Sequence, residues 1–158
     1  MRTGTLGTKR ESIIVPRSDQ FEELYRLDQE SFGDFEAYTY FFLRQLFDAC
    51  RHSCLIIVAD GRLVGYVLTV HNSGEEQATI MALCVAPEYR GFGYGHKLLD
   101  AAISRLRKHA ATSVVLVVKP DNKPARNLYR DHGFRCVRRL PDHFGPGRDR
   151  VELRLKLN

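Results

Sequence analysis

A glycine-rich turn between a predicted strand and a predicted helix constrains this chain more than any other segment. An apolar β-type run covers Ala78 to Val85, and a helical pattern covers Gly95 to His109. The connection contains an arginine and three alternating glycines, Arg90-Gly91-Phe92-Gly93-Tyr94-Gly95. Glycine permits positive φ angles and close approach of a ligand to the main chain, and a helix start directs unpaired N–H groups at the same point. The segment predicts a binding site for a phosphate or pyrophosphate.

Two common phosphate-binding motifs do not fit this turn. A P-loop requires Gly-x4-Gly-Lys-Ser/Thr, which the turn lacks. A dinucleotide fingerprint requires Gly-x-Gly-x-x-Gly near the first strand of a βαβ unit, whereas here the spacing is Gly-x-Gly-x-Gly and more than half of the chain precedes it. A purely structural turn is the simplest alternative. The pattern Gln/Arg-x-x-Gly-x-Gly/Ala after a strand ending in Val-x-Pro fits position by position, and in this the chain resembles the GNAT superfamily of acyl-CoA-dependent N-acetyltransferases.

A second motif strengthens the resemblance. The continuous apolar run Val114 to Val118 predicts a short buried strand. The turn after it leads to Asn122, a good helix cap, and Gly133 is placed to end that helix. The segment from Asn122 to Phe134 resembles the GNAT signature Asn-x-x-Ala-x-x-Leu/Phe-Tyr-x-x-x-Gly-Phe, with every fixed position matched. Two motifs in this order predict a member of that superfamily.

Composition narrows the class of protein. The 158 residues, 44% hydrophobic and 27% charged, suggest one soluble globular domain. We expect a cytoplasmic protein without membrane attachment, because no apolar run approaches the roughly 20 residues of a span and the basic start has no signal-peptide core. The four cysteines form no Cys-x-x-Cys pair, so we expect reduced thiols and no metal. The net charge of +5 suits a phosphorylated cofactor. We expect no nucleic-acid partner, because the basic residues do not form a patch interspersed with aromatic residues.

The order of predicted elements is that of an α/β protein. We expect a disordered tail over residues 1–10 and a single GNAT domain over 11–158, with a mixed, mostly antiparallel sheet and about four helices. The helices are expected from Phe21, from Glu36 to Cys50 after an interruption at 31–35, from Gly95 and from Asn122. The strands are expected at 12–15, 55–59, 62–70, 78–85, 114–118, 134–140 and 151–157.

The resemblance implies acetyl-CoA as the co-substrate. In the family the pantetheine arm lies between the third meander strand and the following buried strand, which splay apart. If this arrangement applies to this chain, backbone groups of the strand that ends at Val85 hold the arm and the glycine turn holds the pyrophosphate. Asn122 then contacts the arm from the other side. An arginine one turn into the last helix is a further phosphate contact, or simply an exposed helix residue. These cofactor residues are Leu83, Cys84, Val85, Arg90, Gly91, Phe92, Gly93, Tyr94, Gly95, Asn122 and Arg126.

The resemblance also assigns the chemistry, which is attack of an amine on a thioester. Tyr129 matches the family tyrosine that protonates the leaving thiolate, with a core tyrosine as the alternative. Some protein N-terminal acetyltransferases carry a basic Glu or His on the buried strand, where this chain has Val117. The general base is therefore open among His71, Glu75, Glu76 and His143.

The acceptor is predicted from the first helices and the tail. Phe32 and Phe35 either pack in the core or line an acceptor groove, and the segment 141–149 is similar to the tail of the ribosomal-protein-alanine N-acetyltransferase branch. His143 and Phe144 stand where that branch often has two tyrosines, and Arg148 replaces a glutamate. The favoured acceptor is a protein or peptide N-terminus, with a small-molecule amine as the alternative and a non-catalytic acyl-CoA sensor as a third possibility. We expect a monomer or homodimer.

Overall fold

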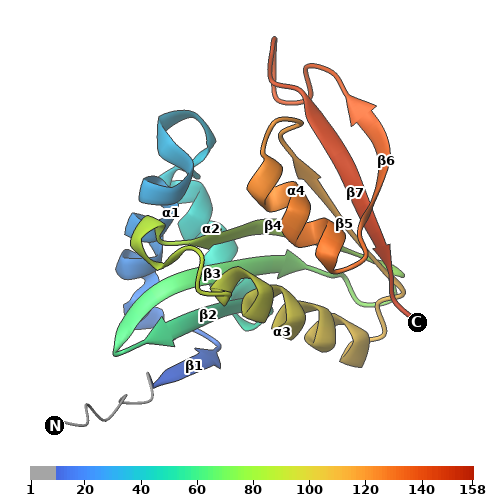
Figure 1. Cartoon of the computed structure of the whole chain (residues 1–158). Helices are drawn as coiled ribbons and strands as arrows, with labels where there is room; N and C mark the ends of the chain where they lie inside the picture. The colour runs from blue at the N-terminus through green and yellow to red at the C-terminus, as the bar shows by residue number, and fades with distance from the viewer. Residues whose placement is uncertain (1–9) are drawn as a thin grey trace, which may run out of the picture.

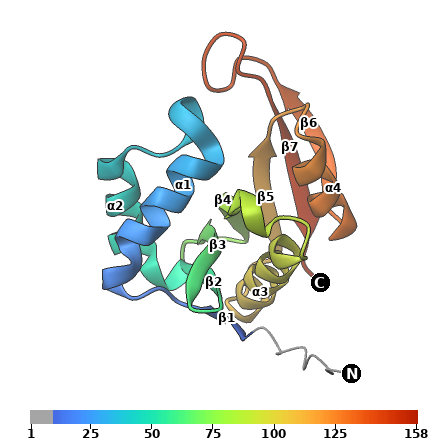
Figure 2. The same cartoon turned by 60° about the vertical axis from the view of Figure 1, so that its left-hand side comes forward.

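A seven-stranded sheet with helices on both faces forms the framework of the protein in a computed structural model, which describes residues 10–158 (Figure 1). The strand order is β1-β2-β3-β4-β5-β7-β6. Helices α1 and α2 cover one face, and α3 and α4 lie on the other (Figure 2). The predicted α/β fold with a mixed, mostly antiparallel sheet is confirmed. The disordered tail was predicted over residues 1–10; residues 1–9 lie outside the described residues, and this part of the chain stays a prediction.

Strands β2, β3 and β4 form the predicted antiparallel meander, and β1 pairs antiparallel with β2 at its edge. They are β1 (Glu11–Ile14), β2 (Cys54–Ala59), β3 (Arg62–Val70) and β4 (Gln77–Val85). The β2–β3 hairpin turns at Asp60 and Gly61, whose φ angles of 50° and 79° are those of a tight two-residue turn. In β4 the register shifts next to Ala82, so that the carbonyl of Met81 accepts a hydrogen bond from Tyr38 Oη at 3.0 Å.

Strands β4 and β5 (Ser113–Val118) are parallel and pair only where both begin. Their register covers 77–79 of β4 against 113–115 of β5 and ends there. Strand β5 instead pairs along its whole length with β7 (Arg150–Lys156), and β6 (Arg135–Leu140) forms the sheet edge. The second halves of β4 and β5 therefore diverge, which confirms the predicted splaying.

The first two helices differ in extent from the prediction. Helix α1 (Phe21–Glu36) is interrupted by a kink at Gly33 (φ 68°, ψ −177°), within the predicted interruption at 31–35, and its last turn runs on to Glu36. Helix α2 (Tyr40–Cys50) begins four residues later than predicted, because the Thr39 side chain caps it by accepting from Phe42 N. Leu43 and Phe47 of α2 are buried against the sheet, whereas Phe42 is 45% exposed.

The remaining helices match the sequence pattern. Helix α3 (Tyr94–Lys108) buries its apolar side chains against the sheet. Three short 3-10 helices lie at residues 18–20, 51–53 and 87–89. Helix α4 (Lys123–Asp131) is capped by Asn122 Oδ1, which accepts from Ala125 N at 3.2 Å. Gly133 follows with φ 89°, as a helix end requires. Together α3 and α4 form one hydrophobic core with the sheet, and α1 and α2 form a second.

Candidate active site

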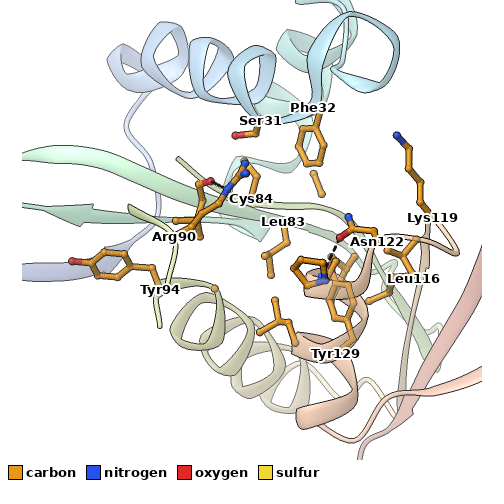
Figure 3. Close-up of a pocket in the computed structure, with 18 of the residues that line it drawn as sticks. Ser31, Phe32, Leu83, Cys84, Arg90, Tyr94, Leu116, Lys119, Asn122 and Tyr129 are labelled. Carbon is orange, nitrogen blue, oxygen red and sulfur yellow. Dashed lines mark hydrogen bonds between the residues drawn. The ribbon is translucent and has the colours of Figure 1, made fainter. Parts of the chain in front are cut away.

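A pocket of about 790 Å³ lies where β4 and β5 separate (Figure 3). Its walls come from these strands, the starts of α3 and α4, and the end of α1. Most of the predicted site residues line it although they come from several elements: Phe32, Leu83, Cys84, Val85, Arg90, Gly91, Gly93, Tyr94, Gly95, Asn122 and Tyr129. The structure thus brings both sequence motifs to one cavity.

The glycine turn forms the pocket wall at the start of α3. Gly91 and Gly93 both have φ 82°, and a Cβ on either would meet no atom within 4 Å. Gly93 occupies the N-cap of α3 without a side chain to bond the first N–H groups of that helix. These N–H groups and the positive end of the helix dipole favour an anion there. Arg90 turns back instead, and its Nε donates to Val85 O at 3.0 Å, holding the end of β4.

Tyr129 lies on the opposite wall and is buried, with its ring 5.5 Å from that of Phe134. Burial raises the pKa of Tyr129 well above its ordinary value, so the phenol keeps its proton at neutral pH. A protonated phenol is what protonation of a leaving thiolate requires. Burial also raises the pKa of Cys84 to about 12, so this pocket thiol stays neutral and is a poor nucleophile.

Five predicted site residues do not line the pocket. Phe92 is 59% exposed beside it, and Arg126 Nη1 donates to Pro120 O at 2.8 Å, bracing the turn before α4. Phe35 is 81% exposed and lies under the guanidinium of Arg148, 5.3 Å from its ring centroid. The rings of His143 and Phe144 contact each other in the loop between β6 and β7. The aromatic residues of this group lie outside the cavity itself, and their roles stay predictions.

The candidate bases also lie elsewhere. His71, Glu75 and Glu76 precede β4, at the end of that strand opposite Val85, and His71 Nε2 is 2.7 Å from Glu75 O. Neither these residues nor His143 line the pocket, whereas Val117 does. In the part of the chain that the structure describes, no predicted base therefore reaches the cavity.

Sequence reasoning missed a charged cluster in the pocket. Glu36 at the end of α1 accepts a hydrogen bond from Arg150 on β7 at 2.8 Å and forms an ion pair with Lys119 after β5, at 2.9 Å. Ser31 of α1 also lines the pocket, near Cys84 (Figure 3). Glu36 and Arg150 are 114 positions apart, and no local pattern marks such a contact. The only feature of the sequence that could have indicated this cluster is the position of Lys119, in the turn directly after a buried strand.

The structure shows two further features that bear on function. Within residues 10–158, no three His, Cys, Asp or Glu side chains are grouped so as to hold a metal ion. Over the same residues, every helix is too short or too polar to span a bilayer.

Several known proteins are similar to this chain in sequence. The profile of the acetyltransferase (GNAT) family matches residues 19–134, so the chain belongs to this family. An N-alpha-acetyltransferase of Sulfurisphaera tokodaii is 27% identical over 125 residues, covering 72% of this chain and 75% of the relative. A Bacillus subtilis protein assigned as a ribosomal protein bS18-alanine N-acetyltransferase is 29% identical over 118 residues, covering 75% and 76%. The chain is an acyl-CoA-dependent N-acetyltransferase.

Solved structures share the fold. Ard1 from Thermoplasma volcanium superimposes with a TM-score of 0.83 at 24% identity, covering 94% of this chain and 98% of that one. Naa50 of Arabidopsis thaliana, solved with a bisubstrate analogue of CoA and a peptide, has a TM-score of 0.81 at 19% identity, covering 93% and 99%. The predicted GNAT fold is confirmed.

Proposed function

We propose that this enzyme transfers an acetyl group from acetyl-CoA to the α-amine of a protein or peptide N-terminus. The observation that supports this most strongly is the pocket between the diverging strands. It joins a glycine turn at a helix start, a strand edge without a partner and a buried, protonated tyrosine. Each of these features matches one part of an acyl-CoA thioester.

The pocket suits the co-substrate on physical grounds. Beyond Thr79, the edge of β4 that faces β5 has no strand pairing, so its peptide groups can bond the amides of the pantetheine arm. The open backbone at Gly91 and Gly93 and the first N–H groups of α3 suit the pyrophosphate. Asn122 Oδ1 is engaged in its cap, which leaves its amide NH2 as the group that can contact the arm.

The reaction follows from these positions. A neutral amine attacks the thioester carbonyl, the N–C bond forms and the C–S bond breaks. A backbone N–H near Val85 stabilises the negative charge that develops on the carbonyl oxygen. Tyr129 donates its proton to the departing thiolate and recovers one from the newly formed amide nitrogen or from solvent.

The acceptor follows from the amine that the pocket can use. An α-amino group has a pKa of about 8, whereas a lysine side chain has about 10.4, so the former supplies far more neutral amine at neutral pH. None of the four predicted bases lines the cavity within the described residues. An α-amine needs less help from a base than a lysine side chain does, and the N-alpha-acetyltransferase relative supports the same acceptor. Cytoplasmic location and a monomeric or homodimeric state stay predictions.

Two measurements test the proposal in order. Thermal unfolding with acetyl-CoA should show stabilisation of roughly 2.7 kcal/mol at about 100 times the dissociation constant, with acetate and adenosine diphosphate as controls. Thiol release should then be measured on peptides with free or blocked N-termini and on small amines. Turnover on free peptides alone supports the proposed acceptor, and turnover on small amines alone contradicts it. A thermal shift without turnover on any amine would instead identify an acyl-CoA sensor.

A further inference from the structure

One carboxylate oxygen bridges two cations in the pocket. Glu36 Oε1 lies 2.8 Å from Arg150 Nη2 and 2.9 Å from Lys119 Nζ. The two cations are neighbours across the β5–β7 ladder, because Val118 pairs with Val151 and each cation lies one position beyond that pair. Lys119 and Arg150 thus present their donors to one point, and Glu36 shows that a carboxylate can occupy it.

Arg150 is held rigidly. Its side chain is 9% exposed, its Nη1 donates to Asp149 O at 2.8 Å, and its guanidinium lies 4.7 Å from the ring centroid of Phe144. A buried charge is costly unless it is paired, and Glu36 is the carboxylate that pairs with it. Lys119 is freer, since its side chain is 47% exposed and its ammonium has three donors.

The cluster carries excess positive charge. Two cations share one carboxylate, and Arg148 adds a third cation nearby, on the exposed ring of Phe35. Asp142 and Asp149 of the adjoining loop do not line the pocket: Asp142 Oδ1 accepts from Gly147 N at 2.6 Å, and Asp149 Oδ1 accepts from Asp142 N at 2.9 Å. Among the described residues, the lysine, arginine and acidic side chains that line the pocket are Arg90, Lys119, Arg150 and Glu36. A further carboxylate brought into the pocket would therefore find positive charge in excess.

We propose that Lys119 and Arg150 recognise a carboxylate of the acceptor, so that the preferred acceptor is a peptide with Asp or Glu as its first or second residue. This inference rests on the proposed function and names the substrate class for it. Lys119 directly follows β5, which forms one wall of the pocket, and Arg150 begins the neighbouring β7, whereas the proposed pyrophosphate position lies at the start of α3. Glu36 moderates the site, because it occupies donors that the acceptor carboxylate would use.

The test compares matched peptides in thiol-release assays with acetyl-CoA. Each pair differs only in Asp against Asn, or Glu against Gln, at position one or two of an otherwise uncharged peptide. We expect kcat/KM to be about fivefold higher or more for the acidic member, the size of a partly exposed ion pair. The ratio should fall as salt rises from 0.05 to about 0.5 M, because salt screens exposed charges.

Two variants should move this ratio in opposite directions. Lys119→Met removes a donor and should bring the acid-to-amide ratio to about one, since the remaining Arg150 is matched by Glu36. Glu36→Gln frees both cations and should raise the ratio. Lys156→Met, an exposed lysine at the far end of β7 and outside the pocket, is the matched control and should leave it unchanged. A merely structural role of Glu36 or Lys119 would slow acidic and amide peptides equally.

The outcomes separate the two proposals. Equal rates on acidic and amide peptides, or a ratio unmoved by Lys119→Met, would overturn the acidic preference while leaving N-terminal acetylation intact. An acetyl-CoA thermal shift with no turnover on any peptide would overturn the proposed acceptor, and the acidic preference would fall with it. A ratio that rises in Glu36→Gln and falls in Lys119→Met would establish the recognition site.

Discussion

Tyr66 Oη donates a hydrogen bond of 2.6 Å to Asp28 Oδ1, and both side chains are fully buried between α1 and the sheet. The other carboxylate oxygen, Oδ2, accepts from Tyr38 N at 2.8 Å. Tyr38 lies in the connection between α1 and α2, and its hydroxyl reaches the β4 carbonyl of Met81. One carboxylate thus ties the α1–α2 connection to the sheet beside the pocket.

Replacing the buried tyrosine should destabilise the fold. Tyr66→Phe leaves Asp28 Oδ1 without its donor in the core, and an unsatisfied buried acceptor costs about 1–3 kcal/mol. Urea unfolding followed by circular dichroism measures this loss. The matched control is Tyr40→Phe, which removes an exposed hydrogen bond to Glu22 and should change the free energy of unfolding by less than about 0.5 kcal/mol. Equal losses in both variants would contradict the structural role of Asp28.

The same carboxyl predicts a pH dependence of stability. Burial, opposed by its hydrogen bonds, raises the pKa of Asp28 above the ordinary 3.8. The folded state then binds the proton more tightly than the unfolded state, so this contribution to stability is fully present below pH 3.8 and is lost as the pH rises through the folded pKa. The free energy of unfolding of the wild type relative to Asp28→Asn should therefore fall as the pH rises. A difference that grows with pH would contradict the raised pKa.

The sequence predicted the framework of the site because its signals are local. The Asn122 cap and the two apolar strand segments each depend on a few adjacent residues, and all were found where expected. The pocket between β4 and β5 follows once these elements are placed. Gly33, with its positive φ, forms the kink in α1 where the sequence predicted an interruption, and Ala37 N bonds Gly33 O in the turn that follows.

The charged cluster could not be predicted in this way. Arg150 begins a strand with alternating polar residues, where an arginine normally faces solvent, and only the tertiary fold brings Glu36 to it. Phe35 and Phe144 are candidate acceptor contacts, and the structure places an arginine on each ring. The aromatic residue type indicated a contact surface at these positions. Which side chain lies against each ring depends on contacts between residues distant in sequence.

A methyl group at Gly65 should disturb both packing and the pocket. A Cβ at this position would lie 2.8 Å from Cys84 O, with Leu98 and Ile57 side chains at 3.0 and 3.1 Å. Gly65→Ala should therefore destabilise the protein by about 1–3 kcal/mol through overpacking. Gly95→Ala offers the contrast, because its Cβ would meet only Leu128, at 3.4 Å and beyond, and Val85 at 4.0 Å, and stability should change by less than about 1 kcal/mol. Thermal unfolding of both variants checks the order.

Removing the Tyr129 hydroxyl should separate binding from chemistry. Tyr129→Phe keeps the ring that packs on Phe134 and deletes the proton donor, so the acetyl-CoA thermal shift should persist while kcat falls by about 100-fold or more. Because burial raises the pKa of Tyr129, the wild-type rate should show no loss from ionisation of this group between pH 7 and about 9. A variant with unchanged kcat would exclude Tyr129 as the proton donor.

A charge at the glycine turn should have the complementary effect. Gly93→Asp places a carboxylate where the first N–H groups of α3 and the positive helix end favour an anion, so it competes with and repels the pyrophosphate. The acetyl-CoA thermal shift should be lost, whereas the fold should survive, because a Cβ at Gly93 meets nothing within 4 Å and aspartate tolerates positive φ better than most residues. Circular dichroism confirms folding and calorimetric titration measures binding. Retained binding of acetyl-CoA in Gly93→Asp would mean that the pyrophosphate does not lie at this turn. Equal loss of binding in Tyr129→Phe would contradict the assignment of binding to the glycine turn and of proton donation to Tyr129.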